Sequence, residues 1–380
     1  MSWKTTNLGK LCKIFDSLRK PITKKFRKRG KYPYYGATGI VDYVDDYIFN
    51  ETLVLIGEDG AKWNVGEQTA FIVSGKYWVN NHAHVIKPDE DKLNQKFLVY
   101  YLNSINLNPW VTGITVPKLN QEKLKSIPIP LPSIAEQKKI VDKLDMIFAG
   151  IDKTLIATNN NIKNTEKLFQ SYLTEVFKHG SKDWKIYSIK ELGKVITGST
   201  PKTSVAENYG DFISFVKPGD FKTDGSIDFE KQKLSKIGMS KSRVVEKKSS
   251  LMVCIGATIG KSGYTDIDIV TNQQINSITP TSKFNYKFIY YQMLTSEFQK
   301  KVMNSYGQAT LPIINKSKWQ SLTMKLPSID EQLEMVKTLD NLRIETDILK
   351  NKLLTKTNEL SSLKLSILRQ GLAGELAQVA

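Results

Sequence analysis

The chain has 380 residues, a formal net charge of +17, and 40% hydrophobic and 24% charged residues, the composition of a folded protein of two or three domains. This composition excludes disordered and collagen-like chains, and no apolar run approaches the ~18–20 residues of a membrane span or forms a signal peptide at the N-terminus. The two cysteines, Cys12 and Cys254, exclude a multi-cysteine metal site and suit a reducing cytoplasm, where we expect the protein.

Residues 1–130 are predicted to form an α+β domain, with strand-like runs at 52–57 and 71–75 and a helical run at 96–105. The segment 19–31 contains eight Lys or Arg residues and no acid. Such a loop can displace phosphate counterions, although a solvated basic loop or a targeting patch is the plain alternative. We predict phosphate contacts from Arg27, Lys28, Arg29 and Lys31.

Other residues of this domain are predicted to contact bases or a DNA groove. His82 and His84 would share one face of a strand, and imidazoles can read base edges, whereas a zinc site needs further ligands. A structural role, with the imidazoles satisfied by hydrogen bonds inside the domain, is the alternative. Tyr34 belongs to a tyrosine-rich run that could stack on a nucleic acid, although such tyrosines more often pack in a core. The predicted set is Tyr34, Lys62, His82, His84 and Lys118.

Residues 131–180 are predicted to form a long helix. Ser133 followed by Glu136 is a capping-box start, and apolar residues then recur at alternating spacings of four and three. Sustained heptads favour a coiled coil, and the alternative is an ordinary amphipathic helix that packs on its own domain. Residues 326–380 repeat the pattern, with Ser328 and Glu331 at the start.

Residues 181–325 are predicted to form a second α+β domain, with strands at 250–256 and 275–279 and a helix at 286–305. This segment carries 22 basic and 12 acidic residues, and residues 1–130 carry 19 and 12. The helical segments are nearly neutral, so the pattern predicts two polyanion-binding modules on a neutral spacer. The residues predicted to contact DNA here are Lys202, Lys217, Lys241, Arg243, Lys261, Gln273, Gln274, Gln308 and Lys316.

The second half of the chain repeats the first. LPSIAEQKKIVDKLD (131–145) and LPSIDEQLEMVKTLD (326–340) share nine of fifteen residues. Two shorter matches lie inside the globular segments: NNHAHVIKP (80–88) with NQQINSITP (272–280), and LIGEDGA (55–61) with CIGATIG (254–260). The repeat predicts a tandem duplication of one domain and one helix.

No catalytic, cofactor-binding or metal-binding residue is predicted. The run IGATIGKSG (255–263) resembles a phosphate-binding loop but is one residue short of the required spacing. Asn108-Pro109-Trp110 resembles part of an amino-methyltransferase motif but lacks the second proline, and no glycine-rich strand–turn–helix accompanies it.

The two repeated helix starts resemble those of the specificity subunits of Type I restriction–modification systems. The tail SILRQGLAGEL (366–376) resembles the end of that family's distal helix, and SYLTEVFKHG (171–180) that of its central helix. TGITVPKLNQEKLKSIPIPLPS (112–133) resembles the closing segment of its target-recognition domains. The resemblance covers nearly the whole chain and is weakest in the middle of each domain.

This resemblance implies an α+β fold with a pseudo-twofold tandem repeat: target-recognition domains at 1–130 and 181–325, and a central (131–180) and a distal (326–380) helix that pair antiparallel. It implies a non-catalytic DNA-binding subunit that reads an asymmetric bipartite site in double-stranded DNA. It also implies two methyltransferase subunits as partners, with restriction subunits in the full complex. S-adenosylmethionine and ATP would then bind to those partners and not to this chain.

Two other classes of function remain open at this stage. A nuclease or methyltransferase with tandem DNA-binding domains would need an active site that the sequence does not display. A non-catalytic adaptor with two basic modules would bind RNA or an acidic protein, although no RNA-binding signature is visible. Activity of the purified chain alone would favour the enzyme, and equal competition by unrelated RNA would favour the adaptor.

Overall fold

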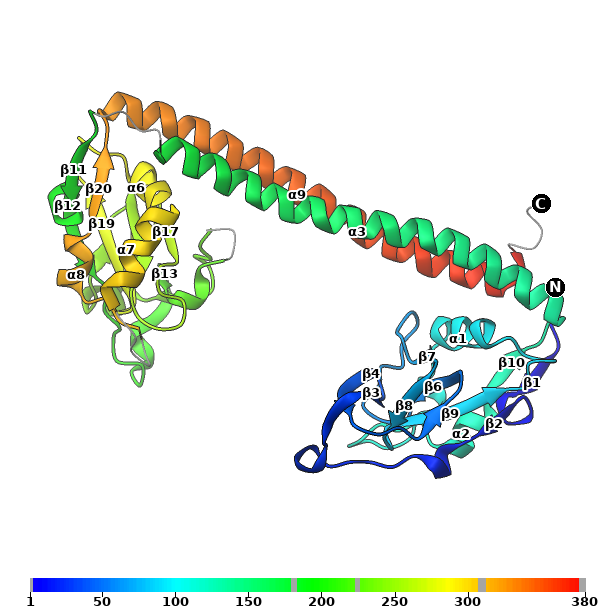
Figure 1. The fold of residues 1–380 in the computed structure, drawn as a ribbon. Helices are drawn as coiled ribbons and strands as arrows, with labels where there is room; N and C mark the ends of the chain where they lie inside the picture. Colours follow the sequence, from blue (N-terminus) through cyan, green and yellow to red (C-terminus); the bar gives the residue numbers. More distant parts are fainter. Residues whose placement is uncertain (1–2, 179–182, 223–225, 307–311, 376–380) are drawn as a thin grey trace. The chain divides into compact units, whose positions relative to one another are not determined.

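The computed structural model describes residues 3–178, 183–222, 226–306 and 312–375 (Figure 1). Contacts divide the chain into two compact units, residues 1–160 with 354–380 and residues 161–353. Each unit contains one α+β domain and a part of both long helices. No helix within the described residues combines the length and the apolar character needed to cross a membrane.

Domain 1 contains two four-stranded sheets, ordered β2-β9-β6-β7 and β4-β3-β8-β5, and a short antiparallel pair, β1-β10. The central strand β6 is buried along its whole length because it packs on both faces. The strands are β1 (Thr5–Asn7), β2 (Cys12–Ile14), β3 (Arg29–Gly36), β4 (Gly39–Val44), β5 (Phe49–Asn50), β6 (Leu53–Gly57), β7 (Ala70–Val73), β8 (Lys76–Val79), β9 (Ala83–Pro88) and β10 (Pro128–Pro130).

Two α-helices complete domain 1, and an asparagine caps each of them. The side chain of Asn94 accepts from the backbone N–H of Phe97 at the start of α1 (Gln95–Ser104). The side chain of Asn120 accepts from the backbone N–H of Lys123 at the start of α2 (Gln121–Ser126). Helix α1 buries Phe97, Leu98 and Leu102 in the core that also contains residues of β6. The 3-10 turns are η1 (Leu8–Lys10), η2 (Asp16–Leu18), η3 (Lys24–Phe26) and η4 (Asn108–Trp110).

Domain 2 has the same strand connectivity, with sheets ordered β12-β19-β16-β17 and β14-β13-β18-β15 and the pair β11-β20. The agreement in all three sheets confirms the tandem duplication. The strands are β11 (Lys185–Ser188), β12 (Gly193–Thr197), β13 (Tyr209–Val216), β14 (Lys233–Leu234), β15 (Val244–Val245), β16 (Ser249–Val253), β17 (Ser262–Thr265), β18 (Ile269–Thr271), β19 (Ile275–Pro280) and β20 (Thr323–Leu326).

The helices of domain 2 correct one prediction. The segment 286–305 forms two helices, α6 (Tyr286–Met293) and α7 (Ser296–Tyr306). Thr295 lies between them, and its hydroxyl accepts from the N–H of Phe298 at 3.3 Å, which favours a new helix start there. The other helical elements are α4 (Ile189–Leu192), α5 (Lys236–Ser240), α8 (Lys316–Ser321), η5 (Ala206–Asn208) and η6 (Pro218–Asp220).

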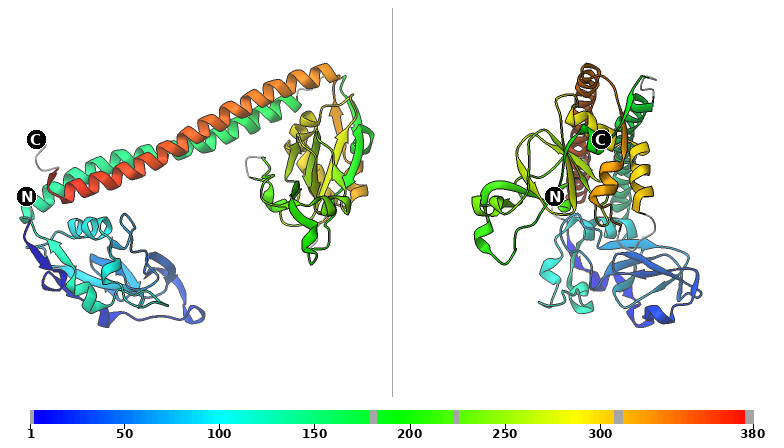
Figure 2. Two further views of the ribbon diagram at one scale, coloured as in Figure 1. Left: turned by 180° about the vertical axis from the view of Figure 1, so that it is seen from behind. Right: turned by 90° about the vertical axis from the view of Figure 1, so that its left-hand side faces the viewer.

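The two long helices, α3 (Ile134–Lys178) and α9 (Ile329–Leu372), run side by side in Figures 1 and 2. Within unit 1, Lys364 Nζ lies 2.6 Å from Asp152 Oδ1, and within unit 2, Lys350 Nζ lies 2.7 Å from Glu166 Oε1. The residue numbers rise along one helix while they fall along the other, so the pair is antiparallel. The fold is therefore two α+β domains joined by an antiparallel helix pair, as expected.

The heptad pattern identifies most of the helix interface. Leu144, Phe148 and Phe169 of α3 are buried, as are Leu339 and Thr346 of α9. Towards the end of α3 the buried position passes to Leu173, whereas Tyr172, which continues the spacing of four and three after Phe169, is exposed. A straight helix of 3.6 residues per turn drifts relative to a strict heptad, which accounts for this difference.

Candidate nucleic-acid interface

The basic segment of domain 1 separates into one tethered residue and several free ones. Arg27 is half-buried: its Nε donates to the carbonyl of Ile22 at 2.9 Å, its Nη1 lies 3.1 Å from Asp42 Oδ2, and it stacks over Tyr34. Lys28 and Arg29 are exposed and have no ion-pair partner among the described residues. Lys31 is also exposed, over the ring of Tyr32. The free cations therefore suit phosphate contact better than Arg27 does.

Two predicted contact residues do not fit their predicted role. Tyr34 is 1% exposed and its hydroxyl accepts from the N–H of Ile22, so it packs in the core. His84 is fully buried at 0% exposure. Successive side chains of a strand point to opposite faces of its sheet, and Tyr34 in β3 and His84 in β9 lie on buried faces. The prediction that they contact a base or a groove is wrong for this conformation.

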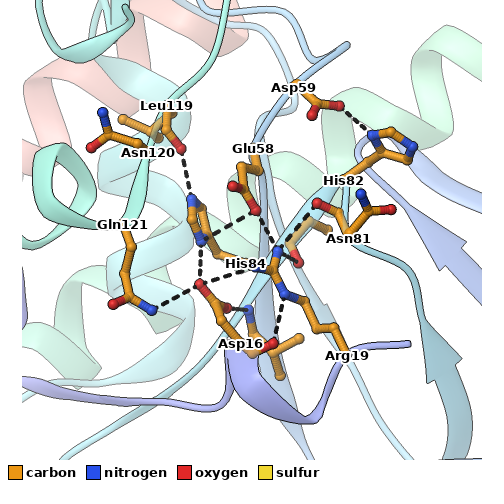
Figure 3. Close-up of polar contacts among 12 residues, drawn as sticks. Asp16, Arg19, Glu58, Asp59, Asn81, His82, His84, Leu119, Asn120 and Gln121 are labelled. Atoms are coloured by element: carbon orange, nitrogen blue, oxygen red, sulfur yellow. Dashed lines mark hydrogen bonds and ion pairs between the residues drawn. The ribbon is translucent and has the colours of Figure 1, made fainter. Parts of the chain in front are cut away.

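His84 instead lies at the centre of a buried polar network (Figure 3). Its Nδ1 lies 2.6 Å from Asp16 Oδ2, and its Nε2 lies 2.7 Å from the carbonyl of Leu119. Both ring nitrogens face acceptors, which anchors the imidazole between η2 and the segment before α2. The carboxylate of Asp16 also accepts from the N–H of Val85 at 2.9 Å and from Gln121 Nε2 at 3.2 Å.

Glu58 forms the second acidic centre of this network, directly after β6. Its carboxylate pairs with the guanidinium of Arg19, and its Oε1 lies 2.9 Å from Lys118 Nζ. Arg19 also donates to the carbonyl of Ala83 at 2.8 Å, and its Nη2 lies 3.5 Å from Asp16 Oδ2. Four segments distant in sequence, at 16–19, 58, 83–85 and 118–121, are thereby joined at one place.

The network lowers the pKa of both carboxyl groups. Burial alone would raise the pKa of Asp16, but the hydrogen bond and charge of His84, together with Val85 and Arg19, outweigh burial and lower it. Burial would likewise raise the pKa of Glu58, but the hydrogen bonds from Arg19 and Lys118 outweigh burial and lower it. Both groups are therefore ionised over the physiological range.

Asp16, Glu58 and His84 bring three ligand-type atoms within 4.8 Å of one another. The arrangement does not resemble a metal site, because Arg19 and Lys118 already supply positive charge to the carboxylates and both nitrogens of His84 are engaged. The cluster is better explained as an anchor for the segments that converge on it.

Domain 2 replaces this charged network by neutral groups. Strand register makes His84 and Asn276 equivalent, because β2 begins opposite Pro88 of β9 as β12 begins opposite Pro280 of β19. At the equivalent of Asp16, Thr197 Oγ1 donates to Asn276 Oδ1 at 2.6 Å. Asn276 Nδ2 lies 3.2 Å from the buried Cys254 Sγ.

The same register corrects one sequence match. In β6, Ile56 pairs with His84, and in β16, Met252 pairs with Asn276. Glu58 is therefore equivalent to Cys254, whereas the match of LIGEDGA with CIGATIG is displaced by three residues. The match at 80–88 agrees with the register.

Four predicted residues of domain 2 gather around one surface loop, residues 198–203. Thr200 Oγ1 donates to Gln273 Oε1 at 2.6 Å, and Ser199 Oγ accepts from the N–H of Arg243 at 2.9 Å. Asn208 connects the carbonyl of Lys202 at 2.9 Å with Lys241 Nζ at 3.2 Å. Lys202, Lys241, Arg243 and Gln273 are all exposed.

The remaining predicted residues are more scattered. Gln274 is half-buried and accepts from Asn272, and Lys261 Nζ lies 3.4 Å from the carbonyl of Phe221. Gln308 lies outside the described residues. Lys62, His82 and Lys316 are exposed; Lys62 lies near Glu67, and His82 pairs with Asp59. Lys118 and Lys217 are half-buried.

Sequence reasoning missed Asp16, Arg19 and Glu58 as a unit. Glu58 carries one usable signal, since it directly follows the wholly apolar strand β6, where an acid needs a partner. Asp16 and Arg19 lie far away in sequence and give no such signal. Ser199 and Thr200, which organise the domain 2 cluster, are small polar residues in a loop and are equally inconspicuous.

Comparison with known proteins gives a consistent result across the chain. The family model described as Type I restriction modification DNA specificity domain matches residues 1–164 and again 181–358. S.HindORF215P of Haemophilus influenzae, named as a candidate type I restriction enzyme specificity subunit, is 31% identical over 273 residues, 69% of this chain and 67% of its own. The specificity subunit of the type I restriction enzyme EcoDI from Escherichia coli is 22% identical over 99% of this chain and 89% of its own.

A solved structure supports the fold. A chain from a study of complex assembly and conformational transition of the type I R-M system superposes with a TM-score of 0.76. It is 18% identical in sequence, and the match covers 98% of both chains. The architecture of two domains and two long helices is therefore shared over nearly the whole length.

Proposed function

Since the chain belongs to the family of Type I restriction–modification DNA specificity subunits, we propose that it reads an asymmetric bipartite DNA site, one half with each α+β domain. The working segments are residues 1–130 and 181–325 for recognition, and 131–180 and 326–380 for the helix pair. The observation that carries this proposal is the repeated three-sheet topology, which provides two equivalent frames for DNA contact.

The asymmetry follows from what each copy carries on that frame. Domain 1 has the charged network of Asp16, Glu58 and His84, whereas domain 2 has Thr197, Cys254 and Asn276 in equivalent places. The exposed cations also differ between the domains. Domain 1 has Lys28 and Arg29, and domain 2 has Lys202, Lys241 and Arg243 around the loop 198–203. The network and its counterpart are largely buried, so they hold the two frames differently, and the different exposed groups should read different half-sites.

The helix pair would set the distance between the half-sites. Helix α3 has 45 residues and α9 has 44. At a rise of 1.5 Å per residue, each spans about 66 Å. A helix pair of fixed length would leave a fixed number of base pairs unread between the two halves.

The same helices would dock two methyltransferase subunits, with restriction subunits added in the full complex. Large apolar residues remain exposed along them after they pair with each other, including Met146, Ile156, Leu168, Ile344 and Ile348. Exposed apolar surface of this kind suits a protein partner. S-adenosylmethionine and ATP would be held by the partner subunits, and this chain would contribute no catalytic residue.

The docking proposal has a direct test. Leu155→Asp with Leu353→Asp introduces charge at half-buried positions of the helix pair, and we expect loss of methyltransferase co-purification. Asn159→Asp, at an exposed position of α3, is the matched control and should leave co-purification unchanged. Normal binding by the double variant would place the docking surface elsewhere.

The recognition proposal is tested by exchange of one domain. Residues 1–130 are replaced by the corresponding segment of another family member with a different site, and the methylated sequence is mapped. We expect one half of the site to change while the other half and the spacing persist. A change in both halves, or in neither, would contradict the assignment of one half-site to each domain.

A further inference from the structure

A tight hairpin protrudes from domain 1 at residues 112–118. Its base is closed by two backbone hydrogen bonds of 2.8 Å between Thr112 and Lys118, one in each direction. Gly113 has φ +91°, and a Cβ there would lie 2.5 Å from the carbonyl oxygen of Val116, so only glycine fits this turn. The hairpin therefore has a defined shape.

The tip of this hairpin presents apolar side chains to solvent. Ile114 is 103% exposed and Val116 is 64% exposed. A single exposed apolar residue needs no explanation. Here, two β-branched residues project from a closed turn, and no described residue covers Ile114.

The base of the hairpin is fixed to the buried network of domain 1. The N–H of Leu119 donates to the carbonyl of Glu58 at 2.8 Å, and the carbonyl of Leu119 accepts from His84 Nε2 at 2.7 Å. Lys118 Nζ lies 2.9 Å from Glu58 Oε1, and Gln121 Nε2 donates to Asp16 at 3.2 Å. These bonds hold the base of the hairpin in a fixed position on the domain.

The charge around the hairpin favours a polyanion. From Ile105 to Gln121 the chain contains no Asp or Glu, and it contains Lys118 together with four Asn or Gln residues. The whole domain carries 19 basic and 12 acidic residues. Lys118 is paired with Glu58, so the attraction for a polyanion comes from the net positive charge of the domain, and the apolar tip can offer its side chain to the base stack.

We propose that the 112–118 hairpin inserts into duplex DNA at the half-site of domain 1, with Ile114 as an apolar wedge against the base pairs. This inference rests on the proposed DNA-reading function and adds the element that deforms the duplex. Side chains of this type partly unstack a base step and kink DNA, and the deformability of that step then contributes to recognition.

The test uses the full chain in complex with its methyltransferase subunits. Duplexes that contain the methylated site carry 2-aminopurine at successive positions, so that unstacking appears as a rise in fluorescence. We expect wild type to give a rise at one step of the domain 1 half-site. Ile114→Ala should abolish the rise and weaken binding about tenfold, because the wedge contact is lost. Ile114→Phe should retain the rise.

Ile40→Ala is the matched control, since Ile40 is an exposed isoleucine of the same domain. It should change neither fluorescence nor affinity. Unchanged fluorescence and affinity for Ile114→Ala would overturn the inference. Loss of methyltransferase binding with normal DNA binding would also overturn it, because the tip would then dock a protein. Absence of site-specific binding by the wild-type complex would instead remove the proposed function itself.

Discussion

The side-chain oxygen of Gln137 accepts a hydrogen bond of 2.8 Å from the backbone N–H of Asn94, the residue that caps α1. Gln332 makes the same 2.8 Å bond to Asn285, which caps α6. Both glutamines are fully buried, and each also donates from Nε2 to the carbonyl of the proline five residues before it. The repeated glutamine thus fastens each long helix to the capped start of one helix of its own domain, α1 or α6.

Gln137→Leu should destabilise the protein by about 2 kcal/mol, because the N–H of Asn94 and the carbonyl of Pro132 lose their buried partner. Gln332→Leu should cost a similar amount. Gln170→Leu, at an exposed position of α3, should stay within about 0.5 kcal/mol of wild type. Urea unfolding of the full chain measures the stability of all three variants. Equal stability of Gln137→Leu and Gln170→Leu would show that the hydrogen bonds of Gln137 do not stabilise the attachment of α3 to α1.

A second set of polar contacts joins α3 to α1 and α9 to α6, about two helical turns after the glutamines. Asp145 accepts from Lys96 Nζ and from the hydroxyl of Tyr100, and Asp340 accepts from Lys287 and Tyr291 at 2.8 and 2.6 Å. Burial first, and then the Asp145 carboxylate, raise the pKa of Tyr100 well above its ordinary range. Tyr100 therefore keeps its proton and donates a hydrogen bond at neutral pH.

Asp145→Asn should cost about 1 kcal/mol, since it weakens two hydrogen bonds at a partly exposed site. Asp152→Asn is the matched control on the same helix: Asp152 pairs with Lys364 at a more exposed position and should cost less than half as much. Thermal unfolding in low salt compares them. A larger loss for the Asp152 variant would show that the contacts of Asp145 contribute little.

The buried network of domain 1 predicts acid sensitivity. The pKa values of Asp16 and Glu58 are lowered in the folded state, so their contribution is present above the unfolded-state values and is lost as pH falls through the folded-state values. Asp16→Asn should cost about 3 kcal/mol at pH 7, because His84 and Arg19 lose a charged partner. This difference should shrink below about pH 4 as Asp16 of the wild type is protonated.

Domain 2 supplies the control for this pH dependence. Thr197 occupies the position equivalent to Asp16 and does not ionise, and burial raises the pKa of Cys254 to about 12. Thr197→Val should therefore have an effect that is constant between pH 3 and pH 7. A constant effect of Asp16→Asn over the same range would contradict the assignment of an ionised Asp16 to the network.

Two arginines of the basic segment 19–31 should have different roles, one in DNA binding and the other in stability. Arg29→Ala should leave unfolding unchanged and reduce the salt dependence of DNA binding by about one ion, since Arg29 is free to contact phosphate. Arg27→Ala should lower stability, because Arg27 bonds Ile22 and Asp42 and stacks on Tyr34. Filter binding between 50 and 200 mM salt, together with thermal unfolding, separates the two effects.

Local patterns were sufficient for the elements and the repeat. Ser133 and Ser328 marked the starts of both long helices, and the N–H groups of Glu136 and Glu331 donate to these serines at 3.3 and 3.4 Å. Strands β6, β7, β16 and β19 fall within or beside the predicted runs. These features depend on residues that lie close together in sequence, where spacing and propensity are visible.

The candidate site was less accessible to sequence reasoning because it depends on distant contacts. Tyr34 and His84 have side chains suited to nucleic acid, but both lie on buried faces of their strands. The equivalence of Glu58 with Cys254 required strand register, since nearby glycines favour an alignment displaced by three residues. Residue type alone could not distinguish the tethered Arg27 from the free Arg29.

The most direct test of the central claim is single-molecule sequencing of DNA methylation in a host that expresses this chain with its neighbouring methyltransferase subunit. A second host expresses the methyltransferase subunit alone. We expect a new methylated motif of two unequal halves separated by a fixed unread spacer, present only with this chain. Identical methylation in both hosts, with the methyltransferase shown to be active, would contradict it.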